Sequence, residues 1–223
     1  MSLTDAQLTG RDESHLHFRG SIALMPACWQ AFEELRDAAA AAGFELCIAS
    51  GFRSFDRQLV IWNAKALGQR PVHDDRGLAV AMDELSPLQQ VQAILRYSAL
   101  PGASRHHWGT DLDVYDAAAM PEGYPLQLTP QEVADDGMFG TLHCWLDEQI
   151  KAGTGAGFFR PYATDRGGVA PERWHLSFAP LAQECAAGLG LVCLREALVT
   201  GELVYSELVL NELPALYERY VVV

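Results

Sequence analysis

Long apolar runs are missing from this 223-residue chain, and no window reaches the 18 or so uninterrupted apolar residues that a membrane-spanning helix requires. Basic residues are also scarce, since 16 Lys and Arg stand against 29 Asp and Glu, for a formal net charge of -13. Nucleic-acid backbones and anionic membrane surfaces attract clustered positive charge instead. We therefore expect neither a nucleic-acid partner nor a stable membrane span.

Export and disulfide signals are missing as well. The first seven residues carry neither the basic segment nor the apolar segment of a signal peptide. We therefore expect a cytoplasmic protein on the sequence as given, or a periplasmic or envelope protein if a leader was removed. The cysteines are odd in number, scattered and without a Cys-x-x-Cys pair, which favours buried free thiols over a disulfide framework. They are Cys28, Cys47, Cys144, Cys185 and Cys193.

Repeats, low-complexity tracts and linker-like stretches are absent too, while 49% of the residues are hydrophobic. This composition is that of an ordinary globular protein with enough apolar surface for a core. We expect one domain over residues 1–223, with its functional core at about 25–180 and a helical extension at about 181–223. The sequence does not define the oligomeric state.

Hydrophobic periodicity predicts helices and short strands along this chain. Apolar residues recur on one helical face from Pro26 to Ala42, and the residues after Gly43 have the pattern of a strand. Ser54 and Ser86 are in position to cap two later helices. The expected strands are 44–49, 111–115, 158–160 and 174–178; the expected helices are 26–42, 55–67, 139–150, one from Pro87 to about Pro101, and most of 179–213. The first 24 residues should form an irregular arm, and residues 220–223 an edge strand. This order predicts an α+β fold with a small, mostly antiparallel sheet flanked by helices.

The segment Ser104–Tyr115 concentrates residues that can bind a metal: it contains two histidines, a glycine and two acids. If Gly109 turns the chain and a strand follows, alternation places Asp111 and Asp113 on one face of that strand. The turn can then bring His106 back beside Asp113, and a tight turn of this kind favours the positive φ that glycine adopts readily.

A second motif, Pro171–Ser177, can complete the site. Catalytic zinc sites use three protein ligands of the histidine and carboxylate type and leave one position open. His175 would be the third ligand from a neighbouring strand, and Glu172 would act as a base toward water at the open position. The residues alone also allow a hydrogen-bonded structural cluster or a metal-free His–Asp catalytic pair. In the metal interpretation, Asp111 can orient a ligating histidine.

Three motifs together resemble the signatures of the VanY-type D-alanyl-D-alanine carboxypeptidases. They are Ser104-x-His106-x-x-Gly109-x-x-x-Asp113, Glu172-x-Trp174-His175, and Ser50-Gly51-Phe52-Arg53-Ser54 with Gln58. Their order and spacing, over about residues 25–180, are far more specific than any one motif. This family is part of a zinc group that includes lysostaphin-like endopeptidases and the hedgehog signalling domain.

The resemblance implies a hedgehog/D-Ala-D-Ala peptidase-like fold with one bound Zn2+. By position in the motifs, it implies the zinc ligands His106, Asp113 and His175, and Glu172 as the general base. Arg53 would bind the terminal carboxylate of the substrate or polarise its scissile carbonyl, because the planar guanidinium pairs well with a carboxylate. The substrate pocket would be lined by Ser50, Gln58, Ser104 and Trp174.

We therefore expect a zinc-dependent carboxypeptidase that cleaves a terminal D-amino acid, D-Ala, from peptidoglycan stem peptides or their precursors. The alternatives are a cell-wall endopeptidase or D,D-dipeptidase with the same site, a non-catalytic hedgehog-like zinc-binding domain, and a structural zinc site. The presence of Glu172 and Arg53 argues against a pure binding domain, which needs no base. The choice between D,D- and L,D-specificity stays open.

Two positions depart from the family pattern. Asp111 occupies a position where the family usually has a small residue, commonly Ala, and Arg173 occupies the position before the tryptophan where Pro is frequent. A carboxylate at position 111 would raise the local negative charge, alter the metal preference or meet a substrate amine. These departures leave the ligand assignment unchanged and leave the substrate preference open.

Overall fold

The structure is a computed structural model that describes residues 2–222. Its main sheet has the strand order β3-β4-β6-β5, and each strand is antiparallel to its neighbours. These strands are β3 (Leu46–Ser50), β4 (Asp111–Asp116), β5 (Phe158–Phe159) and β6 (His175–Phe178). A separate hairpin pairs β1 (His17–Arg19) with β2 (Ile22–Leu24). The predicted α+β fold with a small antiparallel sheet is therefore confirmed.

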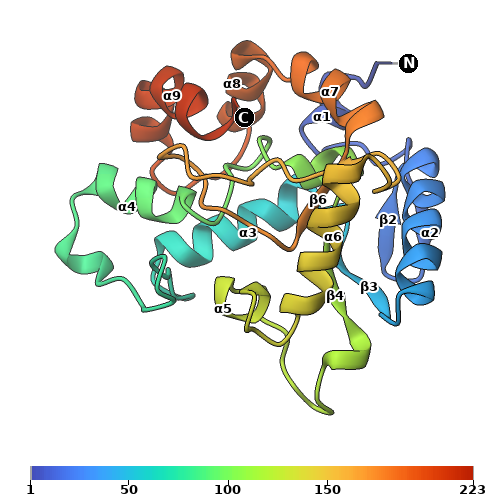
Figure 1. Ribbon diagram of the computed structural model, residues 1–223. Coiled ribbons are helices and arrows are strands. Elements are labelled where there is room, and N and C mark those ends of the chain that lie inside the picture. The colour runs from blue at the N-terminus through green and yellow to red at the C-terminus, as the bar shows by residue number, and fades with distance from the viewer. Residues whose placement is uncertain (1, 223) are drawn as a thin grey trace.

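Helices surround the main sheet, with α2 on one side of the molecule and α4 and α9 on the opposite side (Figure 1). The α-helices are α1 (Asp5–Leu8), α2 (Pro26–Ala41), α3 (Phe55–Ala66), α4 (Pro87–Leu95), α5 (Pro130–Val133), α6 (Gly140–Ala152), α7 (Ala179–Gly188), α8 (Leu191–Val199) and α9 (Ser206–Tyr220). The short 3-10 helices are η1 (Met82–Glu84), η2 (Arg105–Trp108) and η3 (Ala117–Ala119).

Side-chain caps determine where the helices next to the site begin. Ser54 accepts a hydrogen bond from the backbone N–H of Arg57 at the start of α3, 3.2 Å away. Ser86 and Gln89 form a reciprocal capping box at the start of α4, which has Pro87 in its first turn. Both starts agree with the sequence prediction, because a polar cap satisfies amide groups that the first turn leaves without partners.

The sheet and two helices enclose the first hydrophobic cluster. Leu112 and Val114 of β4 and Leu176 of β6 are fully buried against residues of α2 and α6, including Phe32 and Leu146. Because strand side chains alternate, the opposite face of β4 carries Asp111, Asp113 and Tyr115. One face of β4 therefore builds the core while the other presents the acids.

A second hydrophobic cluster lies among α3, α4, α8 and α9. Trp62 of α3 is fully buried there, and its indole N–H donates to the Val204 carbonyl, 3.1 Å away. Leu198 of α8 and Leu213 of α9 are also fully buried in this cluster. The C-terminal helices therefore complete the core around α3, which also carries residues of the candidate site.

Two expectations about the chain ends are wrong. The N-terminal arm contains α1, which Thr4 caps, and the β1–β2 hairpin, whose turn includes Gly20 at φ 62°. The predicted edge strand at 220–223 is replaced by α9, which continues to Tyr220, while Val223 lies outside the described residues. The apolar face of α9 stays buried up to Tyr220, and Val221 and Val222 follow the helix without pairing to a strand.

All five cysteines are free. Cys28 and Cys185 are buried as expected, whereas Cys47, Cys144 and Cys193 are only partly buried. None of the described helices combines the length and apolarity that crossing a bilayer demands.

We propose that residues 1–223 form one domain in which the two clusters unfold together. Leu213→Ala removes a fully buried side chain from the second cluster and should lower the free energy of unfolding by about 2–5 kcal/mol. Urea denaturation followed by tryptophan fluorescence and by circular dichroism should show one coincident transition. Val192→Ala, at a 70% exposed position, should change stability by less than about 0.5 kcal/mol. Separate transitions for the two probes would contradict the single domain.

Candidate active site

Strand pairing brings the two sequence motifs together. Asp113 of β4 lies opposite His175 of β6 in the antiparallel register. His106 lies in η2, which ends at Gly109 with φ 70° in the left-handed region. This left-handed backbone conformation favours glycine, and a Cβ atom at this position would also displace the side chain of Leu16. The predicted turn at Gly109 is confirmed.

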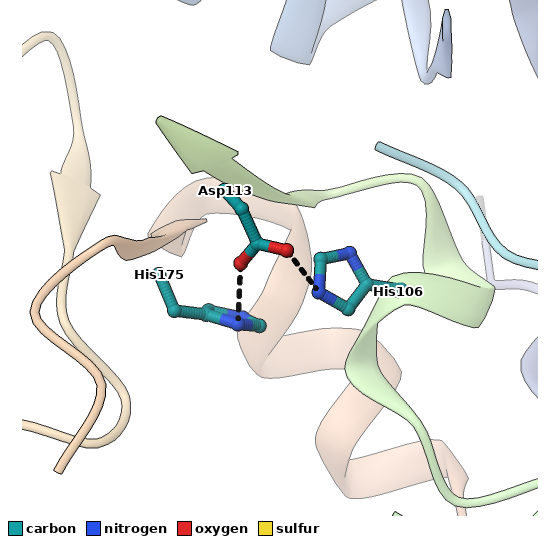
Figure 2. A group of neighbouring side chains, drawn as sticks. All are labelled: His106, Asp113 and His175. Atoms are coloured by element: carbon teal, nitrogen blue, oxygen red, sulfur yellow. Dashed lines mark ion pairs between the residues drawn. The ribbon is translucent and has the colours of Figure 1, made fainter. Parts of the chain in front are cut away.

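His106, Asp113 and His175 form a compact buried group that could hold a metal ion, the candidate metal group (Figure 2). One ligand-type atom from each residue lies within 4.8 Å of the others. His106 Nε2 is 3.3 Å from Asp113 Oδ2, and His175 Nδ1 is 3.3 Å from Asp113 Oδ1. The three side chains come from η2, β4 and β6 and converge on one point (Figure 2).

The hydrogen bonds of both histidines direct ring lone pairs at the Asp113 carboxylate. His106 Nδ1 is 2.9 Å from the Gly51 carbonyl, so this nitrogen carries the proton and Nε2 presents its lone pair. His175 Nε2 is 3.0 Å from Asp111 Oδ1, so Nδ1 presents its lone pair in the same way. Asp113 Oδ1 is buried and has no hydrogen-bond partner among the described residues. The two ring nitrogens and the Asp113 carboxylate are all acceptors, and a bound cation between them would satisfy all three. Two imidazoles and one carboxylate form a ligand set that suits zinc.

Charge around Asp113 favours its ionised form. Burial alone would raise the pKa of this carboxyl, but the two imidazoles, in their protonated form, outweigh burial and hold the pKa well below its usual range. An ionised, buried carboxylate is the form that a metal ligand needs.

Asp111 has a clear structural position behind His175. The side chain is fully buried, and its Oδ1 accepts hydrogen bonds from His175 Nε2 and from Arg105 Nε, the latter at 2.8 Å. Its Oδ2 accepts from the Thr110 hydroxyl at 2.6 Å. Burial opposes ionisation, but Arg105 and then His175 hold the pKa of Asp111 well below its usual range. Because Asp111 is sealed from solvent, it does not meet a substrate amine; it holds His175 in one tautomer and orientation.

Arg105 completes this arrangement on the far side of Asp111. Its guanidinium is buried and donates a second hydrogen bond to the Ser177 hydroxyl at 2.7 Å. Arg105 therefore neutralises Asp111 and ties η2 to β6. Its position six residues before Asp111 carries no recognisable motif, and the residues alone did not single it out.

Glu172 lies beside His175 and is not one of the three residues whose ligand-type atoms converge. Its Oε2 is 3.5 Å from His175 Nδ1, and its side chain is 13% exposed. Tyr162 packs edge-on against the His175 ring, with centroids 5.2 Å apart, and closes the site on that side. Both residues line a cavity of about 420 Å³, so Glu172 can reach a molecule bound there.

Arg53 is held at the end of β3 by two polar side chains. Its Nη1 donates to Gln58 Oε1 at 3.0 Å and its Nη2 to the Ser50 hydroxyl at 3.4 Å. Gln58 is fully buried and its amide donates in turn to the Ala99 carbonyl at 2.7 Å. The guanidinium itself faces the cavity, where burial lowers its pKa and the charges of Asp113 and Glu172 oppose that effect.

His107 fixes the backbone of Arg53. Its Nδ1 is 2.5 Å from the Arg53 carbonyl, while its Nε2 accepts from the Gly102 N–H at 3.0 Å. Burial lowers the pKa of His107 to about 3, so the ring is neutral at pH 7. Of the two adjacent histidines, only His106 faces the metal group, as expected for a single ligand from this pair.

The cavity brings most of the predicted site residues together, and its volume of about 420 Å³ suits a small peptide. The predicted residues that line it are Arg53, Ser104, His106, Asp113, Glu172, Trp174 and His175. Ser50 and Gln58 do not line it and contact the Arg53 guanidinium instead. The cavity also includes Lys65 and Tyr162, which sequence reasoning missed. Lys65 could have been found, because it lies seven residues after Gln58 on the same helical face.

Arg173, the second departure from the family pattern, binds structural groups outside the cavity. Its Nη1 donates to Asp135 at 2.7 Å and to the Val133 carbonyl at 2.8 Å, and its Nη2 lies 2.7 Å from Asp147. It therefore ties α5 and α6 to the chain just before Trp174.

The antiparallel sheet thus carries the buried His106, Asp113 and His175, with Glu172 beside them. The VanY family, described as D-alanyl-D-alanine carboxypeptidase, matches residues 21–181, which is more than half of the chain. The chain therefore belongs to the VanY family of peptidases.

Relatives in sequence come from Haemophilus influenzae, and both are named only as uncharacterized proteins. One is 44% identical over 110 residues, covering 45% of this chain and 72% of the relative. The other is 30% identical over 123 residues, covering 55% of this chain and 93% of the relative.

Solved structures share the fold at lower identity. VanYB in complex with D-alanine-D-alanine aligns over 84% of this chain and 89% of its own, with a TM-score of 0.53 and 23% identity. A D,D-pentapeptidase VanY in complex with Zn(II) aligns over 84% and 92%, with a TM-score of 0.52 and 22% identity. The LD-carboxypeptidase LdcB aligns over 88% and 82%, with a TM-score of 0.52 and 21% identity. These likenesses establish the common fold.

Replacing Asp111 tests whether it supports a metal-binding histidine. Asp111→Asn should lower zinc affinity by about 10–100-fold, because an amide accepts a weaker hydrogen bond from His175 and leaves Arg105 without its buried counter-charge. Competition with a chromophoric chelator measures this affinity without any assay of activity. Asp37→Asn, at an exposed position of α2, should leave it unchanged. Equal zinc affinity in both variants would show that Asp111 does not support the metal site.

Proposed function

We propose that this protein is a zinc-dependent carboxypeptidase that removes a terminal D-amino acid, with D-Ala as the reference residue, from peptidoglycan stem peptides or their precursors. The observation that carries this proposal is the convergence of two histidine lone pairs and the Asp113 carboxylate at a cavity that Glu172 and Arg53 also line. The choice of metal and substrate is supported by the family relatives of the same fold, one solved with Zn(II) and another with D-alanine-D-alanine.

His106, Asp113 and His175 would hold the zinc ion. When bound, zinc supplies a Lewis acid that lowers the pKa of water and polarises a carbonyl oxygen. Glu172 accepts the proton of the attacking water, since its carboxylate lies in the cavity beside His175 and has no arginine or lysine in an ion pair with it among residues 2–222. Glu172 then returns this proton to the departing amine. No covalent intermediate with the protein is required.

Arg53 binds the terminal carboxylate of the substrate. Its guanidinium presents parallel N–H groups that match a carboxylate, and Gln58 and Ser50 hold it in place from behind. Ser104 and Trp174 line the same cavity and position the peptide between Arg53 and Glu172. Restraining the peptide in this way reduces the entropy that the reaction must otherwise lose.

The same site could serve a D,D-dipeptidase or a cell-wall endopeptidase. The guanidinium of Arg53 can form paired hydrogen bonds only with a free carboxylate. The substrate of an endopeptidase has no carboxylate next to the scissile bond. Arg53 therefore favours removal of a terminal residue. A non-catalytic zinc-binding domain would not need a carboxylate at the position of Glu172.

Glu172→Gln tests the proposed mechanism. The amide cannot accept a proton, so kcat for a peptide ending in D-Ala-D-Ala should fall by about 10²–10⁴-fold, while the zinc content stays at one ion per chain. Steady-state kinetics and elemental analysis of the same protein samples give both quantities. Glu184→Gln, an exposed change on α7, is the matched control and should keep full activity. A Glu172→Gln protein with bound zinc and undiminished cleavage would rule out this mechanism.

A further inference from the structure

The cavity extends along α3 from the metal group to a second set of basic residues. Gln58, Ile61 and Lys65 lie on one face of α3, and Lys65 is roughly 10 Å further along the helix axis than Gln58. Because helical side chains lean toward the N-terminus, the Lys65 amine extends back toward Arg53. Arg53, Lys65 and Arg70 all line the cavity. One end of the cavity is therefore basic.

These three cations have no carboxylate partner in the described part of the chain. No ion pair within residues 2–222 includes Arg53, Lys65 or Arg70. Lys65 Nζ donates to the neutral Ser98 hydroxyl at 2.7 Å, and Ser98 is nearly buried. Lys65 is half-buried and Arg70 is exposed, so the lack of a carboxylate partner is most informative at Lys65.

Two other buried or half-buried arginines of this protein pair with acids. Arg96 pairs with Asp75 and Asp165 at 2.7 and 2.6 Å, and Arg105 pairs with Asp111 at 2.8 Å. A lysine with a purely structural role usually extends its amine to solvent or pairs with a carboxylate. Lys65 does neither, since its amine is directed at Ser98 on the cavity wall.

The carboxylates that line the cavity are already engaged elsewhere. Asp74 pairs with Arg76 at 2.8 Å, and Asp113 belongs to the metal group. Glu172 Oε2 lies 3.5 Å from His175 Nδ1. Burial, followed by repulsion from Arg70, lowers the pKa of Lys65 to about 8, so an anion at this position would gain a strong partner.

We propose that Lys65, with Ser98 and Arg70, forms a subsite for a second carboxylate on the departing residue, so that the protein prefers an acidic C-terminal residue of the glutamate class over D-Ala. This inference rests on the proposed function, in which Arg53 binds the α-carboxylate of that residue. The side chain of the departing residue then extends along α3 toward Lys65. A dicarboxylic residue satisfies both cations at once, whereas D-Ala leaves Lys65 with only Ser98.

Charge can be isolated from size by comparing two isosteric peptides. Peptides with a common stem that end in D-Glu, D-Gln or D-Ala are assayed with the zinc-loaded protein. The kcat/KM for D-Glu should exceed that for D-Gln by about tenfold or more, because a hydrogen-bonded ion pair replaces a neutral contact. In Lys65→Met this ratio should fall below about threefold. Lys151→Met, at an exposed position of α6, should keep the wild-type ratio.

The chain has two lysines, which allows a second test that needs no turnover. Acylation of the protein at pH 8, followed by peptide mass spectrometry, gives the labelling rate of Lys65 with Lys151 as an internal reference. Free D-Glu should slow labelling of Lys65 about tenfold at saturation, D-Gln should slow it much less, and neither should affect Lys151.

The outcomes separate the two proposals. Cleavage of the D-Ala peptide with no advantage for D-Glu over D-Gln would overturn the subsite and leave the proposed function intact. Failure to cleave all three peptides would overturn the proposed function, and the labelling experiment would then decide the subsite alone. Equal labelling of Lys65 with and without D-Glu would overturn the subsite in either case.

Discussion

A buried carboxylate that faces two histidine lone pairs is the constraint on which this structure depends. Asp113 is 3% exposed, one of its oxygens has no hydrogen-bond partner, and both neighbouring imidazoles direct an acceptor at it. Such an arrangement is costly without a cation, because a buried charge needs a partner. The surrounding elements maintain it: the register of β4 and β6 sets Asp113 opposite His175, and the turn at Gly109 returns His106 to the same point.

Two hydrophobic clusters hold the opposite walls of the cavity. The sheet with α2 and α6 carries the metal group on the face of β4 turned away from that core. The cluster around α3, α4, α8 and α9 carries Lys65 and the neighbours of Arg53. Segment 50–53 joins the two walls, since His106 bonds to the Gly51 carbonyl and the Arg53 N–H donates to the His106 carbonyl at 3.1 Å. The positions of His106 and Arg53 relative to one another are thus set by contacts with the backbone of segment 50–53.

The local geometry of the site was predictable from the residues, whereas the roles of His106, Asp113, His175 and Glu172 were predicted from the resemblance of the motifs to a known family. Alternation along β4 paired Asp111 with Asp113 on one face, and the turn at Gly109 required glycine. The hydrogen bond between Asp111 and His175 agrees with one of the predicted roles of Asp111, but the contact of Arg105 with Asp111 was not predicted, because it depends on how η2 packs against β4 and β6. Lys65 could be placed on the helical face of Gln58 from the sequence, but its contact with Ser98 could not, because these residues are distant in sequence. The tail was predicted as a strand from its valines, but packing of α9 on the second cluster overrides local preference.

X-ray absorption at the zinc edge of the zinc-loaded protein tests the central claim most directly, because it reports the ligands of the metal and not the activity. We expect a first shell of nitrogen and oxygen atoms at about 2.0–2.1 Å, from two imidazoles, one carboxylate and one solvent atom. We also expect outer-shell scattering from two histidine rings. Substitution of Asp113 by Ala should remove one light scatterer or release the metal. A sulfur contribution at about 2.3 Å, or a spectrum that the Asp113 substitution leaves unchanged, would contradict the assigned site.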